Sequence, residues 1–358
     1  MVPPWIVARL IVGGSLGLVR HVVTKLHVTP RPVQVGQGLL AWDAAFYRDI
    51  ARGGYAAVPR AGLRFFPLVP LLSRAVATLP GVDTDFALLV VASVSALAFA
   101  VGLYKLALHE TGDRDLARRA VWLAALAPPA FVLVMGYAEA TLMALAVATA
   151  LMVRTRRWAW ACGFAYLAGL TRPLGVMIAV FVAVEVVTSW TQTRRDGRIA
   201  PLAAVVAAPA GLFTYLLWVQ HRTHAGLFYA LRIQENPLLR GKNVNPVTNI
   251  VDTTRELFSG DRFGSGLHAI TAFALVVLLV VLVRRWPWSY TAYAFATLML
   301  ALTASNLDSL ERYALSTFPF VLAAATIVRP SWERLVWVGC GAGLVALSVL
   351  AFTGTYVP

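Results

Sequence analysis

The feature that most constrains the fold of this chain is the length of its apolar segments. Residues 86–108, 202–219, 270–283 and 335–352 approach or reach about 20 apolar residues, which cross a hydrocarbon core at roughly 1.5 Å per helical residue. The chain of 358 residues is 59% hydrophobic and 13% charged, with a mean hydropathy of +0.71, and no soluble domain of this length has that composition. The sequence therefore predicts an all-α, polytopic membrane protein.

The same length criterion predicts about eleven spans, some of them short or closely paired. Their centres are Ile11, Ser95, Leu126, Leu145, Tyr166, Val180, Val206, Leu275, Ala296, Ala323 and Gly343. An odd number of spans places the two termini on opposite sides of the membrane. The first span resembles a signal peptide, but no clear small-x-small cleavage site follows it, so we expect an uncleaved helix.

Basic residues gather in alternate short loops, and the positive-inside rule assigns such loops to the cytoplasm. The five basic loops contain Arg114/Arg118/Arg119, Arg154/Arg156/Arg157, Arg194/Arg195/Arg198, Arg284/Arg285 and Arg329/Arg334. Two long extracytoplasmic loops, residues 28–85 and 220–266, are then expected on the opposite face, with short turns near Tyr137, Arg172 and Asp308. We expect residues 1–358 to form a single integral membrane domain in a plasma membrane.

The net charge of +14 does not indicate nucleic-acid binding here, because about a dozen basic residues act as topology signals. The remaining basic residues lie on the extracytoplasmic face, where membrane lipid phosphates are suitable partners. Cys162 and Cys340 fall within apolar spans, with no pairing logic or metal-ligand spacing. His221 and His224 have the i, i+3 spacing of a weak metal signal, although two solvated loop histidines are the commoner case. We therefore expect no metal site.

An acid-bearing segment, residues 42–55, stands between two hydrophobic blocks. We expect a helix from about Asp43 to Gly53, ended by the Gly53-Gly54 pair. Asp43 falls on the same side as aromatic residues, whereas Asp49 projects elsewhere and forms an ordinary i, i+3 ion pair with Arg52. Asp43 suits the helix N-cap position, and it also suits a catalytic carboxylate at the membrane surface. These two roles do not exclude one another.

Further polar and aromatic residues lie at the edges of predicted spans. Residues 64–72 are too short and too rich in proline to span, so we expect an interfacial or re-entrant element with Phe65 and Phe66 at headgroup depth. Glu139, Arg172, Asp308 and Arg312 all face outward in the predicted topology. Glu139 can complement a helix dipole, and Asp308 and Arg312 can form an i, i+4 pair. Membrane-edge charges on the leaflet that holds Asp43 also fit a functional site.

The order and spacing of these motifs, from about residue 40 to residue 330, resemble the PIG-V family of mannosyltransferases. The matching residues are Trp42-Asp43, Tyr47, Ile50-Ala51, Gly54-Tyr55, Phe65 to Pro70, Tyr137-Ala138-Glu139, Leu170 to Pro173, Arg312-Tyr313 and Phe318-Pro319. The resemblance implies a GT-C fold enzyme that takes mannose from a polyprenyl-phosphate carrier on the outer face. The compact chain with short loops looks like a bacterial relative. Its expected acceptor is a glycolipid, lipoglycan or protein.

The chemistry of such a transfer assigns roles to the matched residues. Inversion at the anomeric carbon needs one base, for which Asp43 is the candidate, and cations that stabilise the departing phosphate. Arginines can supply that charge without a metal, and no Asp-x-Asp motif lies beside Asp43. Arg64, Arg172 and Arg312 are the candidates. Trp42 and Tyr47 suit packing on a sugar or prenyl chain, or interfacial anchoring, while Glu139 and Asp308 suit sugar hydroxyls or arginine orientation; Tyr313 completes the predicted substrate-binding set.

Two other classes fit the predicted spans. A transporter or lipid flippase also has many helices, but it usually carries ionisable groups near the middle of the membrane and repeated halves. In this sequence Glu185 and Lys105 lie near cytoplasmic span ends, where snorkelling or headgroup contact suffices. A non-catalytic assembly subunit would leave the segment around Asp43 unexplained.

Overall fold

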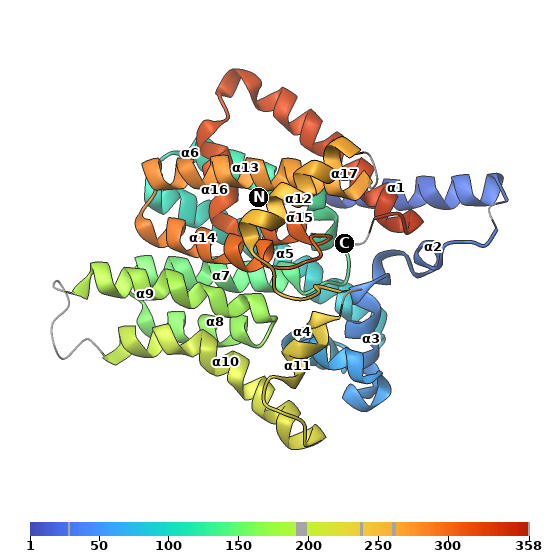
Figure 1. The fold of residues 1–358 in the computed structure, drawn as a ribbon, viewed down its shortest axis with the longest axis horizontal. Helices are drawn as coiled ribbons and strands as arrows, with labels where there is room; N and C mark the ends of the chain where they lie inside the picture. Colours follow the sequence, from blue (N-terminus) through green and yellow to red (C-terminus); the bar gives the residue numbers. More distant parts are fainter. Residues whose placement is uncertain (28, 191–198, 237–238, 260–262, 357–358) are drawn as a thin grey trace. The chain divides into compact units, whose positions relative to one another are not determined.

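The computed structural model describes residues 1–358 except 28, 191–198, 237–238, 260–262 and 357–358. Within these residues the chain is helical, with one isolated antiparallel bridge between Asn243 and Ala304. Figure 1 shows the ribbon. The α-helices are α1 Val2–Lys25, α2 Val33–Gln37, α3 Asp43–Gly53, α4 Leu68–Val76, α5 Thr84–Thr111, α6 Arg114–Leu126, α7 Glu139–Arg154, α8 Trp158–Gly169, α9 Ile178–Thr188, α10 Ile199–Thr223, α11 Tyr229–Arg232, α12 Pro246–Ser259, α13 Phe263–Arg285, α14 Trp288–Leu302, α15 Leu310–Ser316, α16 Phe318–Ile327 and α17 Glu333–Thr353.

Five helical segments are long and apolar enough to cross a membrane. They are Val2–Lys25, Thr84–Thr111, Ile199–Thr223, Gly266–Arg285 and Pro330–Thr353. Two shorter apolar segments, Pro173–Thr188 and Phe318–Ile327, accompany them. All eleven predicted centres fall inside α-helices, which confirms the all-α membrane class, whereas the number of eleven spans stays a prediction.

The chain divides into two compact units. Unit 1 consists of Met1–Pro59, Val69–Thr141 and Ala324–Pro358, and unit 2 consists of Arg60–Leu68 and Leu142–Ala323. The predicted loop 28–85 forms short helices, including α2, α3 and α4, and the predicted loop 220–266 contains α11 and α12.

Arg119 links two helices within unit 1. The sequence placed it in a solvent-facing basic loop, but it lies inside α6 and is buried. Its Nε lies 2.8 Å from Glu333 Oε1, and its Nη1 donates to the carbonyl of Ala325 at 2.8 Å. Burial of a charge requires such partners because desolvation is costly. The contact joins α6 to the start of α17. The predicted topology places the first residues of both helices on the cytoplasmic side.

Glu185 has a similar role in unit 2. Arg154 Nη1 lies 2.9 Å from its Oε2, and Ser289 donates to its Oε1 at 2.6 Å. The expected headgroup or snorkelling contact of Glu185 is therefore wrong, because protein side chains bind this carboxylate. The contacts join the ends of α7 and α9 to the start of α14. The predicted topology places these three helix ends on the cytoplasmic side. The basic loop Arg194/Arg195/Arg198 lies outside the described residues.

Helices α8 and α10 pack closely through small residues, and Figure 1 shows them side by side. A Cβ on Gly169 would overlap the carbonyl oxygen of Ala208, and a Cβ on Gly211 would overlap that of Tyr166. Glycine at both positions lets the two backbones touch, as is common where helices pack in membranes. This contact holds the turn that leads to Arg172.

Candidate functional site

Helix α3 spans Asp43–Gly53, as the sequence predicted. Its inward face consists of Ala44, Tyr47, Ile50 and Ala51, which are all buried. The helix ends because Gly54 adopts a φ of +74° and returns its N–H to the carbonyl of Ile50 at 2.8 Å. Asp43 is the first residue of this helix and is partly exposed, whereas the inward face of the helix is packed against the protein.

Asp43 does not occupy the N-cap position, so the predicted capping role is wrong. Trp42 holds that position, with φ +60° and ψ −127°, and Asp43 is the first helical residue. A carboxylate in the first turn still complements the positive end of the helix dipole. The backbone of Asp43 is thus helical, and the residue before it, Trp42, has an unusual positive φ.

Trp42 has a strained backbone because a bulky residue rarely adopts positive φ. Its indole Nε1 donates to the carbonyl of Ala351 at 2.9 Å, near the end of α17 in the same unit. This long-range hydrogen bond fixes the entry into α3. The strained residue directly precedes Asp43, the first residue of the helix. The predicted packing of Trp42 on a sugar or prenyl chain stays a prediction.

The other residues of this segment make structural contacts. Tyr47 is buried in the inward face of α3, so its predicted substrate contact gains no support from its position. Asp49 pairs with Arg48 at 2.9 Å rather than with Arg52, and Arg52 instead reaches Asp85 at 2.6 Å. The predicted i, i+3 pair is therefore wrong, although Asp49 is an ordinary exposed ion-pair partner as expected.

Glu139 begins α7 and is only 1% exposed. The turn before it docks beside the α3 segment, because the N–H of Gly136 donates to the carbonyl of Leu39 at 3.0 Å. A Cβ at Gly136 would lie 2.8 Å from Leu88 Cδ2, so only glycine fits this approach without a shift. This backbone contact joins the turn before α7 to the segment before α3 within unit 1.

Unit 2 holds the segment that contains Arg64. The hydroxyl of Tyr215 donates to the carbonyls of Leu63 at 2.8 Å and Phe65 at 3.2 Å, and its ring packs on Phe66 with centroids 4.5 Å apart. Phe65 and Phe66 are buried by the protein. They therefore do not anchor the segment in lipid headgroups, because protein side chains take up their surface, and their depth in the membrane stays a prediction.

Arg64 and Arg172 lie on adjoining segments of unit 2. The N–H of Leu68 donates to the carbonyl of Leu170 at 3.2 Å, which joins the two segments. The Arg64 guanidinium carbon lies 4.7 Å from the Phe65 ring centroid, and Arg172 is extended before Pro173. Both arginine side chains remain partly exposed. They can therefore meet an anion from outside the protein.

A polar cluster that the sequence did not reveal surrounds the start of α15. His268 of α13 lies between Glu311, whose Oε1 is 2.9 Å from Nδ1, and Asp308, whose Oδ1 is 3.6 Å from Nε2. Arg312 is buried and donates to Ser309 Oγ at 3.1 Å, and Tyr313 is partly exposed. Local spacing gave no signal for the cluster, because His268 and Glu311 are far apart in the chain. The only hint was a histidine inside an otherwise apolar span.

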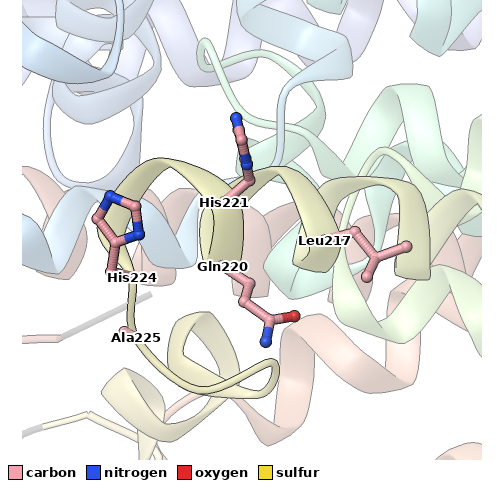
Figure 2. A pocket seen from close by; sticks show the side chains of 5 residues that line it. All are labelled: Leu217, Gln220, His221, His224 and Ala225. Carbon is pink, nitrogen blue, oxygen red and sulfur yellow. The ribbon is translucent and has the colours of Figure 1, made fainter.

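His221 and His224 lie at the end of α10, where they line a shallow hollow with Leu217, Gln220 and Ala225. Figure 2 shows the two imidazoles spaced along the helix end, with Gln220 on another side. Across the described residues, no group of three or more His, Cys, Asp or Glu side chains has an arrangement that could hold a metal ion. This histidine pair therefore stays a weak signal.

No protein-family model matches the chain, and no curated protein matches it. Among solved structures, it is similar to ArnT from Cupriavidus metallidurans bound to undecaprenyl phosphate, with a TM-score of 0.53 and 14% identity over 87% of this chain and 71% of ArnT. It is also similar to the Archaeoglobus fulgidus oligosaccharyltransferase in complex with zinc and sulfate, with a TM-score of 0.44 and 12% identity over 96% of this chain and 53% of that chain. The similarity to ArnT confirms the predicted GT-C fold class.

Proposed function

We propose that this protein is an inverting mannosyltransferase that moves mannose from a polyprenyl-phosphate-mannose donor to a glycolipid, lipoglycan or protein acceptor. The observation that carries the proposal is the shared fold with ArnT, whose structure contains undecaprenyl phosphate. A polyprenyl phosphate is the product that remains when such a donor gives up its sugar. The similarity covers most of this chain, so the proposal concerns the whole helical assembly rather than one motif.

The choice of mannose rests on the ordered motifs that resemble the PIG-V family, from Trp42-Asp43 to Phe318-Pro319. We place the reaction on the extracytoplasmic face of a bacterial plasma membrane, because the basic loops assign the opposite ends to the cytoplasm. This orientation depends on loops that alternate between the two faces of the membrane. The ion pairs Arg119–Glu333 and Arg154–Glu185 support it, because each pair joins helix ends that are both predicted to be cytoplasmic.

In the proposed reaction, Asp43 acts as the general base. An acceptor hydroxyl oxygen attacks the anomeric carbon of mannose, and the bond from that carbon to the phosphate oxygen breaks. The phosphate leaves with the electron pair, and the hydroxyl proton passes to the Asp43 carboxylate. A single displacement converts a β-linked donor into an α-mannoside. The fixed start of α3 and the partly exposed position of Asp43 support this role.

Arginines would stabilise the negative charge on the departing phosphate, so the proposed reaction requires no metal ion. Arg64 and Arg172 are the favoured pair, because both are partly exposed and their segments are joined by the Leu68–Leu170 hydrogen bond. Arg312 is more deeply buried and bonds Ser309, which suits support of α15 rather than first contact with a lipid phosphate.

The test is transfer of label by the purified protein. Radiolabelled undecaprenyl-phosphate-mannose is incubated with native membrane lipids, in parallel with carriers of glucose and of galactose. We expect label in a new lipid or glycan only from the mannose carrier, and we expect the rate to survive strong chelation. Label from another carrier alone would contradict the mannose assignment. Activity that chelation removes and added manganese or magnesium restores would contradict the metal-free mechanism.

A further inference from the structure

His268 is anchored on its buried side by α15. The side chains of His268 and Glu311 belong to residues that are 5% and 3% exposed, and their Nδ1 and Oε1 atoms lie 2.9 Å apart. Thr271, one turn further along α13, donates its hydroxyl to the same Glu311 oxygen at 3.1 Å. The Glu311 carboxylate therefore fixes the plane of the imidazole ring.

The other ring nitrogen faces a much more exposed group. His268 Nε2 lies 3.6 Å from Asp308 Oδ1, and the Asp308 side chain is 48% exposed. This is an ion-pair distance and is longer than a hydrogen bond. The N–H of Asp308 donates to Asn306 Oδ1 at 3.0 Å, which holds the backbone of the turn. A rigid buried ring thus stands behind a carboxylate that is presented outward.

The arrangement does not suit a metal ion, because the two carboxylates face opposite nitrogens of one ring and cannot converge on a common centre with it. It does suit hydrogen bonding to a polyol. A carboxylate accepts hydrogen bonds from hydroxyl groups, and a fixed acceptor binds more strongly than one that must be ordered on binding.

We propose that His268 is a positioning residue that holds Asp308, so that the Asp308 carboxylate accepts a hydrogen bond from a sugar hydroxyl of the substrate. This inference rests on the proposed glycosyl transfer and names a binding contact within it. The hydroxyl belongs either to the transferred sugar or to the acceptor glycan, and the two sources share this chemistry. The distinguishing feature of His268 is that its two nitrogens serve different partners.

Two matched variants separate the two nitrogens. His268→Gln places an amide donor near the position of Nε2, where it can reach Asp308, and gives up the Glu311 contact. His268→Asn places its amide donor near Nδ1, where it can reach Glu311, and gives up Asp308. We expect the Asn variant to raise the KM for one substrate about 10-fold, because Asp308 loses the ion-pair partner that holds it in place, and the Gln variant to stay within about 3-fold.

Thermal stability should show the reverse order. The Asn variant keeps the buried Glu311 partnered and should unfold at a higher temperature than the Gln variant. Thr271→Val removes one hydrogen bond from Glu311 and leaves the direct His268–Asp308 contact in place, so it should lower stability and raise KM by much less than the Asn variant. Separate titrations of donor and acceptor show which KM moves, and this identifies the sugar that Asp308 binds.

The outcomes are separable. If the less stable of the two His268 variants also has the higher KM, His268 has only a structural role and the inference is wrong. The same conclusion follows if neither variant changes KM while the wild-type protein transfers sugar. If the wild-type protein transfers no sugar from any carrier, the proposed function fails and the inference fails with it. The positioning role is supported if the Asn variant is the more stable of the two and also has the higher KM.

Discussion

Asp43, at the start of α3, and Asp308, in the turn before α15, are both partly exposed acidic residues, but the protein holds them in different ways. Backbone geometry fixes Asp43, which follows the strained Trp42 at the first position of α3. Side chains hold Asp308, because His268 stands behind it and Glu311 stands behind His268. One carboxylate is thus set by its own segment, and the other depends on a helix distant in the sequence.

The difference suggests a division of labour. A base must keep its geometry as charge develops in the transition state, and a backbone-held group does so without help from mobile side chains. A group that binds a sugar hydroxyl can depend on a side-chain support that adjusts when the substrate arrives. We therefore expect changes at Asp43 to affect kcat and changes at Asp308 to affect KM.

The largest expected effect is that of Asp43→Asn, which removes the proposed base and keeps the size of the side chain. We expect kcat to fall about 10²–10⁴-fold with little change in either KM, the usual range for loss of general base catalysis. Asp49→Asn, on the same helix but paired with Arg48, is the matched control and should keep wild-type turnover. Equal losses in both variants would mean that α3 is needed only for folding.

The next effect is that of Asp308→Asn, which keeps an acceptor oxygen but removes the charge. We expect one KM to rise about 10-fold and kcat to change much less, because a hydrogen bond to a charged group is lost. Steady-state kinetics with donor and acceptor varied separately measure this. A fall in kcat as large as that of Asp43→Asn would erase the proposed division between the two carboxylates.

Trp42→Phe tests the backbone support of Asp43. The variant loses the indole hydrogen bond to Ala351, so we expect the free energy of unfolding to fall by about 1 kcal/mol and kcat to fall a few-fold. Trp160→Phe, at an exposed position, should change neither quantity. A stable Trp42→Phe variant with full turnover would show that the indole contact does not position Asp43.

The smallest effect is expected for Arg48→Gln, which breaks the partly exposed ion pair with Asp49. Such pairs contribute about 0–1 kcal/mol, so thermal unfolding and turnover should both stay near wild type. A large loss of turnover would place the outer face of α3 in the site and would remove the contrast between Asp43 and its neighbours.

Local features were predictable from the sequence. The bounds of α3 follow from an acid at its start and from Gly53-Gly54 at its end, and the centres of the apolar segments all lie in helices. The N-cap was predicted wrongly: Trp42 holds that position with a positive φ, and its indole contacts α17, far along the chain. Short-range chemistry cannot reveal such a conformation.

Contacts between distant segments were not predictable. Arg119 looked like a loop charge until Glu333 came beside it, and Phe65 and Phe66 looked like membrane anchors until the protein buried them around Tyr215. The sequence around His268 did not predict its role, because its partners Asp308 and Glu311 are distant in the chain. In each case tertiary packing decided what the residue contacts.

The most direct test of the proposed transfer distinguishes bond cleavage from transport. The purified protein is reconstituted in liposomes with radiolabelled undecaprenyl-phosphate-mannose and native acceptor lipids, and released undecaprenyl phosphate is counted against mannose joined to acceptor. We predict one molecule of undecaprenyl phosphate for each mannose transferred, and both products formed about 10²–10⁴-fold more slowly with Asp43→Asn. Movement of the intact donor across the bilayer, with no cleavage by the wild-type protein, would contradict the transferase and favour a flippase.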